Sequence, residues 1–169
     1  KGEGVKQDYL KAIEYYEKSA NFNDSIALNK LGYLYEKGEG VKQDSLKAIE
    51  YFEKSAKLND SRALNKLGYL YLKGEGVKQD SLKAIEYYEK SAKLNNSDAL
   101  NKLGYLYLKG EGVKQDYLKA IEYFEKSAKL NNSDALFNLG LFYENGEGVK
   151  QDYLKAIEYY EKSAKLNNS

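Results

Sequence analysis

The chain has 169 residues, with neither cysteine nor histidine, and its 27 basic residues nearly balance its 26 acidic ones. The missing residue types exclude disulfides, thiolate zinc sites and histidine-based catalysis. A balanced charge argues against a nucleic-acid partner or an anionic membrane partner, and no apolar run approaches the ~20 residues of a membrane span. We therefore expect no catalytic site, no metal, no cofactor, and neither nucleic acid nor membrane as a partner.

One phrase, Gly-Glu-Gly-Val-Lys-Gln-Asp, recurs at a strict spacing of 36 residues, and its five copies begin at Gly2, Gly38, Gly74, Gly110 and Gly146. A period of this length is typical of a solenoid, in which one small unit stacks on copies of itself. We interpret the chain, residues 1–169, as a single repeat domain. It comprises a partial copy (1–23), four full copies (24–59, 60–95, 96–131 and 132–167) and the start of another (168–169).

The first half of each copy predicts an amphipathic helix. In the first full copy the apolar residues recur every three or four positions, at Ala27, Leu28, Leu31, Leu34 and Tyr35. Asp24 or Ser25 is placed to cap the start of this helix, and Gly38 to end it in a left-handed conformation. The loop that follows contains one apolar residue, Val41, which we expect to pack under the helices.

The second half of each copy predicts another helix, with Asp44 as its cap. One side of this helix carries Ala48, Ile49, Phe52, Ser55 and Ala56, and another carries Tyr51 and Leu58. A helix with two apolar sides packs between neighbours, as stacking requires. The chain is therefore predicted to be an all-α, α/α superhelical solenoid of about nine helices. Its uncapped ends are expected to promote end-to-end self-association.

The copies share a longer pattern, Ala-x-x-x-Leu-Gly-x-x-Tyr-x-x-Gly-x-Gly-Val-x-x-Asp-x-x-Lys-Ala-x-x-Tyr, which runs from Ala63 to Tyr87 in the second full copy. This pattern closely resembles the Sel1-like repeat family, relatives of the tetratricopeptide repeats. The resemblance implies a right-handed superhelix with first helices on its concave side, and a non-enzymatic role as an adaptor or scaffold in protein complexes. Two departures are a tyrosine where the second helix often has tryptophan, as at Tyr51, and the absence of the disulfides of the cysteine-rich secreted branch.

The copies differ most in their first helices, at offsets that lie on one face and resemble the ligand-facing positions of the tetratricopeptide first helix. We predict a concave groove for an extended peptide. Asparagine amides can donate to and accept from a peptide, tyrosines give rigid contact area, and edge lysines favour an acidic or carboxylate-ended partner. The candidate binding residues are Asn29, Tyr33, Arg62, Asn65, Tyr69, Leu72, Lys73, Asp98, Asn101, Tyr105, Leu108, Lys109, Phe137 and Leu141.

Three alternatives remain open from the sequence. The asparagines and tyrosines can form a solvated wall in which amides bond one another and rings pack between repeats. The chain can be a structural, even engineered, array without a ligand of its own, or its tyrosines can bind carbohydrate. For Arg62, an ion pair with Asp98 competes with a role as a ligand anchor. The glycine-rich phrase is not a dinucleotide fingerprint, because it follows a helix and lacks the third glycine.

Overall fold

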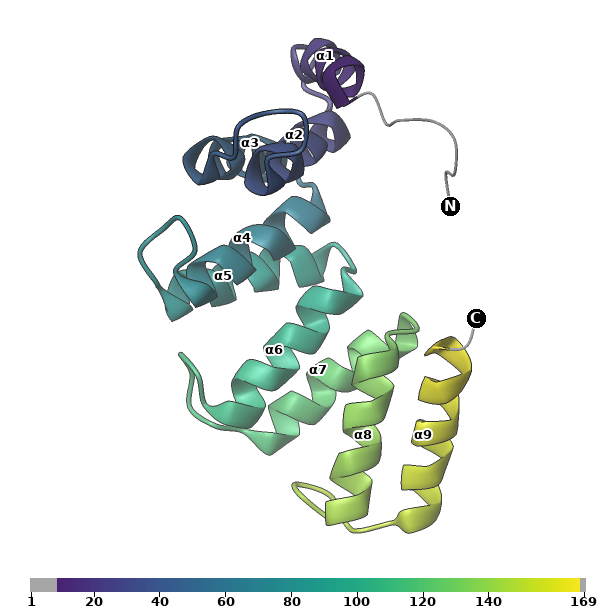
Figure 1. Cartoon of the computed structure of the whole chain (residues 1–169). Helices are drawn as coiled ribbons and strands as arrows, with labels where there is room; N and C mark the ends of the chain where they lie inside the picture. Colours follow the sequence, from purple (N-terminus) through teal and green to yellow (C-terminus); the bar gives the residue numbers. More distant parts are fainter. Residues whose placement is uncertain (1–8, 168–169) are drawn as a thin grey trace. The chain divides into compact units, whose positions relative to one another are not determined.

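The computed structural model describes residues 9–167, and nine helices with no strand make up this range (Figure 1). The first helices of the copies are α2 (Ser25–Lys37), α4 (Ser61–Lys73), α6 (Ser97–Lys109) and α8 (Ser133–Asn145). The second helices are α1 (Tyr9–Ala20), α3 (Ser45–Lys57), α5 (Ser81–Lys93), α7 (Tyr117–Lys129) and α9 (Tyr153–Asn167). The predicted all-α solenoid of helix pairs is confirmed.

The chain divides into two compact units, residues 1–79 and 80–169. In unit 1, α1 packs on α2, α2 on α3 and α3 on α4; in unit 2 the same succession runs from α5 to α9. Every helix thus packs on the next one in the chain within its unit. None of the helices in the described range is long and apolar enough to cross a membrane.

Local sequence sets the helix ends. The Asp24 carboxylate accepts hydrogen bonds from the amides of Ile26 and Ala27, and Gly38 adopts a φ of 73° while its amide donates to the Leu34 carbonyl. Asp44 caps α3 in the same way, through the amide of Lys47. These caps confirm the predictions, and each aspartate cap is worth about 1 kcal/mol of helix stability. Asn59 and its counterparts take positive φ where a second helix ends, a feature that was not predicted from the sequence.

The two helices of a copy meet at a glycine. A side-chain carbon added to Gly32 of α2 would lie 2.5 Å from the Phe52 ring of α3, so only glycine allows this approach. The Ser55 hydroxyl of α3 donates to the Ser25 carbonyl of α2 at 2.7 Å. Phe52, Ser55 and Ala48 are buried, and Val41 packs against the core, as predicted.

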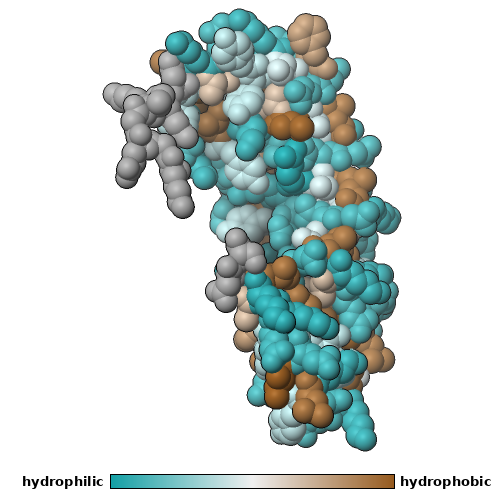
Figure 2. Space-filling view, turned by 90° about the vertical axis from the view of Figure 1, so that its right-hand side faces the viewer, coloured by the Kyte–Doolittle hydropathy of each residue, from teal (hydrophilic) through white to brown (hydrophobic). Residues whose placement is uncertain are grey.

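The other apolar side of the second helix lies on the same first helix. The Tyr51 ring stacks on the Tyr35 ring with centroids 5.5 Å apart, and the Lys47 ammonium donates to the Tyr35 hydroxyl at 2.7 Å. Hydrophobic side chains also reach the surface (Figure 2). The exposed ones include one leucine at the same position of every second helix: Leu10, Leu46, Leu82, Leu118 and Leu154.

Candidate functional site

The first-helix face of unit 2, formed by α6 and α8, brings together most of the residues predicted there. Asn101 is only 4% exposed, and its side-chain oxygen accepts a hydrogen bond from the Asn138 amide at 3.3 Å. The Tyr105 hydroxyl donates to the Asn138 oxygen at 3.1 Å. Asn138 was not predicted, although it is the one asparagine at a position that is lysine in the three preceding copies. This chain of bonds ties α6 to α8 beneath the surface.

Three exposed side chains of α6 and α8 are here called the apolar patch: Tyr105, whose hydroxyl belongs to this chain of bonds, Phe137 and Leu141. Phe137 is 50% exposed, and its ring lies 5.3 Å from that of Tyr160 on α9. The Tyr105 ring meets Phe124 of α7 edge-on at 5.4 Å. Each ring therefore packs against a second helix on one side and faces solvent on the other. Aromatic surface that is held in place but accessible is well suited to protein contacts, because little side-chain entropy is lost on binding.

The corresponding face of unit 1, on α2 and α4, contains an ion pair between the two helices. The Lys66 ammonium lies 2.6 Å from the Glu36 carboxylate, with the Tyr33 and Tyr69 rings 5.6 and 5.0 Å away. Both partners of this ion pair are largely buried. The Tyr69 hydroxyl donates to Glu75 at 3.1 Å, and this bond raises the pKa of the tyrosine. The two predicted tyrosines of unit 1 therefore flank an internal cation.

The asparagines of unit 1 lie below the surface. Asn29 is 2% exposed and Asn65 is half-buried. The side-chain oxygen of each is enclosed, and neither finds a hydrogen-bond partner among residues 9–167. Of the amides predicted to face a ligand, Asn29 and Asn101 are thus buried and Asn65 is half-buried, and in unit 2 two amides bond one another, as in the alternative interpretation. Binding by these amides stays a prediction.

The remaining candidate residues form other contacts or differ in exposure. The Arg62 guanidinium donates to both carboxylate oxygens of Asp60, at 2.7 and 3.1 Å, so it pairs within its own copy. Burial alone would raise the pKa of Asp60, but the hydrogen bonds and the charge from Arg62 bring it below its usual value. Asp98 accepts from the Asn132 amide at 3.0 Å. Lys73 and Lys109 are exposed, Leu72 is buried and Leu108 is half-buried.

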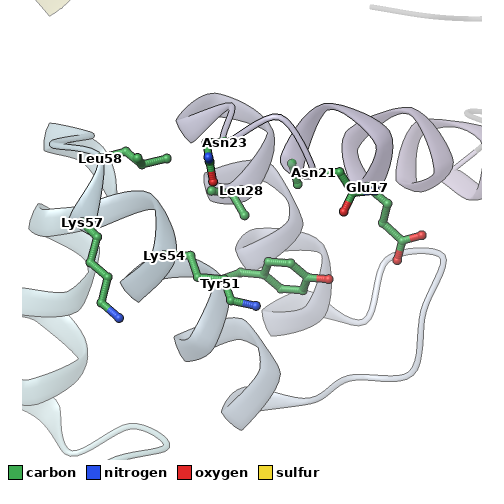
Figure 3. A pocket seen from close by; sticks show the side chains of 9 residues that line it. Glu17, Asn21, Asn23, Leu28, Tyr51, Lys54, Lys57 and Leu58 are labelled. Carbon is green, nitrogen blue, oxygen red and sulfur yellow. The ribbon is translucent and has the colours of Figure 1, made fainter.

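A pocket that the sequence did not predict recurs on the second-helix side. In unit 1 it has a volume of about 570 Å³, and Glu17, Leu28, Tyr51 and Lys54 are among the residues that line it (Figure 3). Its smaller counterpart in unit 2, about 360 Å³, is lined by the same residue types from the later copy. Burial raises the pKa of the Tyr51 phenol in the first pocket. Within the described residues, no group of three acidic, histidine or cysteine side chains is placed to hold a metal.

The chain matches known repeat proteins along most of its length. A family model described as the Sel1 repeat matches residues 1–21, 25–60, 61–96, 97–132 and 133–168. No curated protein matches the chain.

Solved structures share both the fold and part of the sequence. A Sel1 repeat protein from Oxalobacter formigenes is 36% identical, with a TM-score of 0.83 over 94% of this chain and 68% of that one. Helicobacter pylori cysteine-rich protein B is 33% identical, with a TM-score of 0.60 over 80% of this chain and 97% of that one.

A third solved structure is more distant. Immunity protein Pa5087 from Pseudomonas aeruginosa is 25% identical, with a TM-score of 0.67 over 96% of this chain and 60% of that one. The helix pairs, the family match and these likenesses agree with the resemblance seen in the sequence. The chain belongs to the Sel1 repeat family.

Proposed function

We propose that this protein is a non-enzymatic scaffold that binds a segment of another protein on its first-helix faces, with the apolar patch of unit 2 as the main contact. Sel1 repeat proteins are generally interaction scaffolds, which supports the class of function. The observation that carries the proposal is the exposure of Tyr105, Phe137 and Leu141 on two helices that hydrogen-bonded asparagines tie together. Aromatic anchors on a rigid base are typical of the residues that dominate binding energy at protein interfaces.

The edge lysines extend this proposal to the chemistry of the partner. Lys73 and Lys109 are exposed at the ends of α4 and α6. We expect them to favour a segment with acidic residues or a free carboxylate next to its apolar anchor. Because such contacts are exposed, they should add to the association rate and be weakened by salt.

The test is a selection of peptides from a random library on the intact protein, followed by affinity measurements on matched variants. Phe137→Asn and Leu141→Tyr install the residues found at the same positions of the three preceding copies, so both should fold. We expect the double variant to bind the selected peptides at least about tenfold more weakly. The control, Leu154→Ser at an exposed leucine of α9, should bind as the original protein does, because Leu154 is not part of the apolar patch.

A structural array without a ligand is the second candidate. It is favoured by the internal partners that already occupy parts of the first-helix faces, namely Glu36 with Lys66 and Asn101 with Asn138. Selected peptides that bind equally well to the double variant and to the original protein would support this reading and overturn the proposed binding face.

A further inference from the structure

A separate pocket of about 320 Å³ lies in unit 1, at the level where α2 ends and α3 begins. Its buried apolar part is formed by Ile49 of α3 and Leu70 of α4. Its more accessible part is polar, with Ser45, Glu36 and Glu75 among the lining residues. The pocket thus combines an apolar base with two carboxylates, and its volume lies at the lower end of the range for small-ligand sites.

The next copy keeps a serine at this position, Ser81, but the copy after it, also in unit 2, fills the equivalent place with its own side chain. Ser45 corresponds to Tyr117 two copies later, and Leu70 corresponds to Phe142. The Tyr117 ring packs edge-on against Phe142 with centroids 6.3 Å apart, and the Gln115 amide donates to its hydroxyl at 3.3 Å. A planar side chain with a polar end therefore fits among these positions.

The framework around the two places is the same. Gln43 in unit 1 and Gln115 in unit 2 each donate to the carbonyl of a first-helix residue, at 2.9 Å in both cases. The serine or tyrosine β-carbon lies close over an equivalent glycine, Gly76 or Gly148. The exchange of serine for tyrosine therefore changes what fills the space while the backbone around it is kept.

The charge of the lining differs between the two places. Glu36 stands where unit 2 has Leu108, so the pocket of unit 1 has an additional carboxylate. Glu36 is neutralised by Lys66. Glu75 accepts from the Tyr69 hydroxyl, and no cation in the described part of the chain pairs with it. A positive charge that enters the pocket would thus meet an unneutralised carboxylate.

We propose that this pocket binds an arginine side chain of a partner protein. The guanidinium group is planar, like the phenol ring that fills the equivalent place, and its charge matches Glu75. The methylene groups of arginine would cover Ile49 and Leu70, while the guanidinium donates to Glu75 near the opening. Lysine has a compact, strongly hydrated charge and lacks the planar group, so it should bind more weakly. This site lies in unit 1 and does not depend on the apolar patch of unit 2.

The test is a titration of the isotope-labelled protein with acetyl-Gly-Arg-Gly-amide, followed by nuclear magnetic resonance. We expect fast-exchange shifts at the amides of Ser45, Glu75 and Gly76, with a dissociation constant on the order of millimolar for a single side chain. Peptides with citrulline, lysine or tyrosine in place of arginine are measured alongside. Citrulline keeps the shape without the charge and should bind at least about tenfold more weakly.

Matched variants locate the site. Ser45→Tyr should abolish the shifts at Glu75 and Gly76 by filling the pocket as Tyr117 does, whereas Ser45→Ala should keep them. Glu75→Gln should weaken binding by about fivefold or more, and Glu147→Gln, the same change in the copy where Tyr117 fills the space, should have no effect. The proposal is overturned if Ser45→Tyr still shows shifts at Glu75 and Gly76, if the tyrosine or citrulline peptide binds as tightly as the arginine peptide, or if no shift occurs with arginine up to about 20 mM.

Discussion

The same substitution at equivalent positions of two copies should change stability in opposite directions. Asn29 on α2 and Asn101 on α6 occupy the same place in their repeats, and both are buried. The Asn29 oxygen has no hydrogen-bond partner in the described range, whereas the Asn101 oxygen accepts from Asn138. Leucine has the same branched outline as asparagine, so the exchange mainly removes polar atoms.

The expected changes in the free energy of unfolding depend on whether the removed polar atoms had hydrogen-bond partners. A buried acceptor without a partner costs about 1–3 kcal/mol, so Asn29→Leu should stabilise unit 1 by roughly 1 kcal/mol once some repacking is allowed for. Asn101→Leu leaves the buried Asn138 amide without its acceptor, and should destabilise unit 2 by about 1–3 kcal/mol. Replacing Asn138 by leucine as well removes both polar partners and should recover part of this loss.

Native-state hydrogen exchange is the suitable assay, because solenoids can open locally and the amides of α2 and α6 report on the two sites separately. We expect slower exchange in α2 for Asn29→Leu and faster exchange in α6 for Asn101→Leu. If both substitutions change the opening free energy in the same direction, the hydrogen-bond assignment that underlies the argument is wrong.

Three further predictions concern the core, the ionisation of a tyrosine and an exposed isoleucine of α9. Gly104→Ala should destabilise unit 2 by about 1–3 kcal/mol in denaturant unfolding, because the new carbon would lie 2.7 Å from the Phe124 ring; an unchanged midpoint would contradict this close packing. Burial, together with a hydrogen bond to Glu144, raises the pKa of Tyr160 to about 12. Its contribution to stability is complete below the ordinary tyrosine pKa of about 10 and is lost as the pH rises towards about 12. The loss of stability over this window should be smaller in Tyr160→Phe, as measured by unfolding at several pH values. Ile157 on α9 is 52% exposed, whereas its counterpart Ile121 is 7% exposed, so Ile157→Asp should reduce any concentration-dependent self-association seen in sedimentation.

The fold was predictable because each copy contains the residues that begin and end its helices. An aspartate before the first apolar residue and a glycine after the last one give the ends of α2, and the structure places its caps at Asp24 and Gly38. The period of 36 residues then repeats this result along the chain. Such contacts are local in sequence, so one copy is enough to infer them.

The surroundings of the asparagines were not predictable in the same way. Asn29 lies one helical turn before Gly32, on the same side of α2, and the close approach of α3 at that glycine is a tertiary feature. A polar residue beside such a contact becomes buried although its type favours the surface. The pair of Lys66 with Glu36 joins residues of two different copies, and no spacing within one repeat indicates it.

The exceptions to the repeat are where binding chemistry can arise. A side chain that recurs in every copy must find a packing or hydrogen-bonding partner in every copy. In the structure, the recurring glycine packs against an aromatic ring, and the recurring serine hydroxyl donates to a backbone carbonyl. Such contacts are internal and leave nothing for a partner. Where a side chain differs between copies, the neighbouring copies do not provide an internal partner for it. Phe137, which no other copy has, remains half-exposed in unit 2, and Ser45, a residue shared only with Ser81, leaves open in unit 1 the space that Tyr117 fills. Restoring the repeat at these positions is therefore the most direct way to remove binding while the fold is kept.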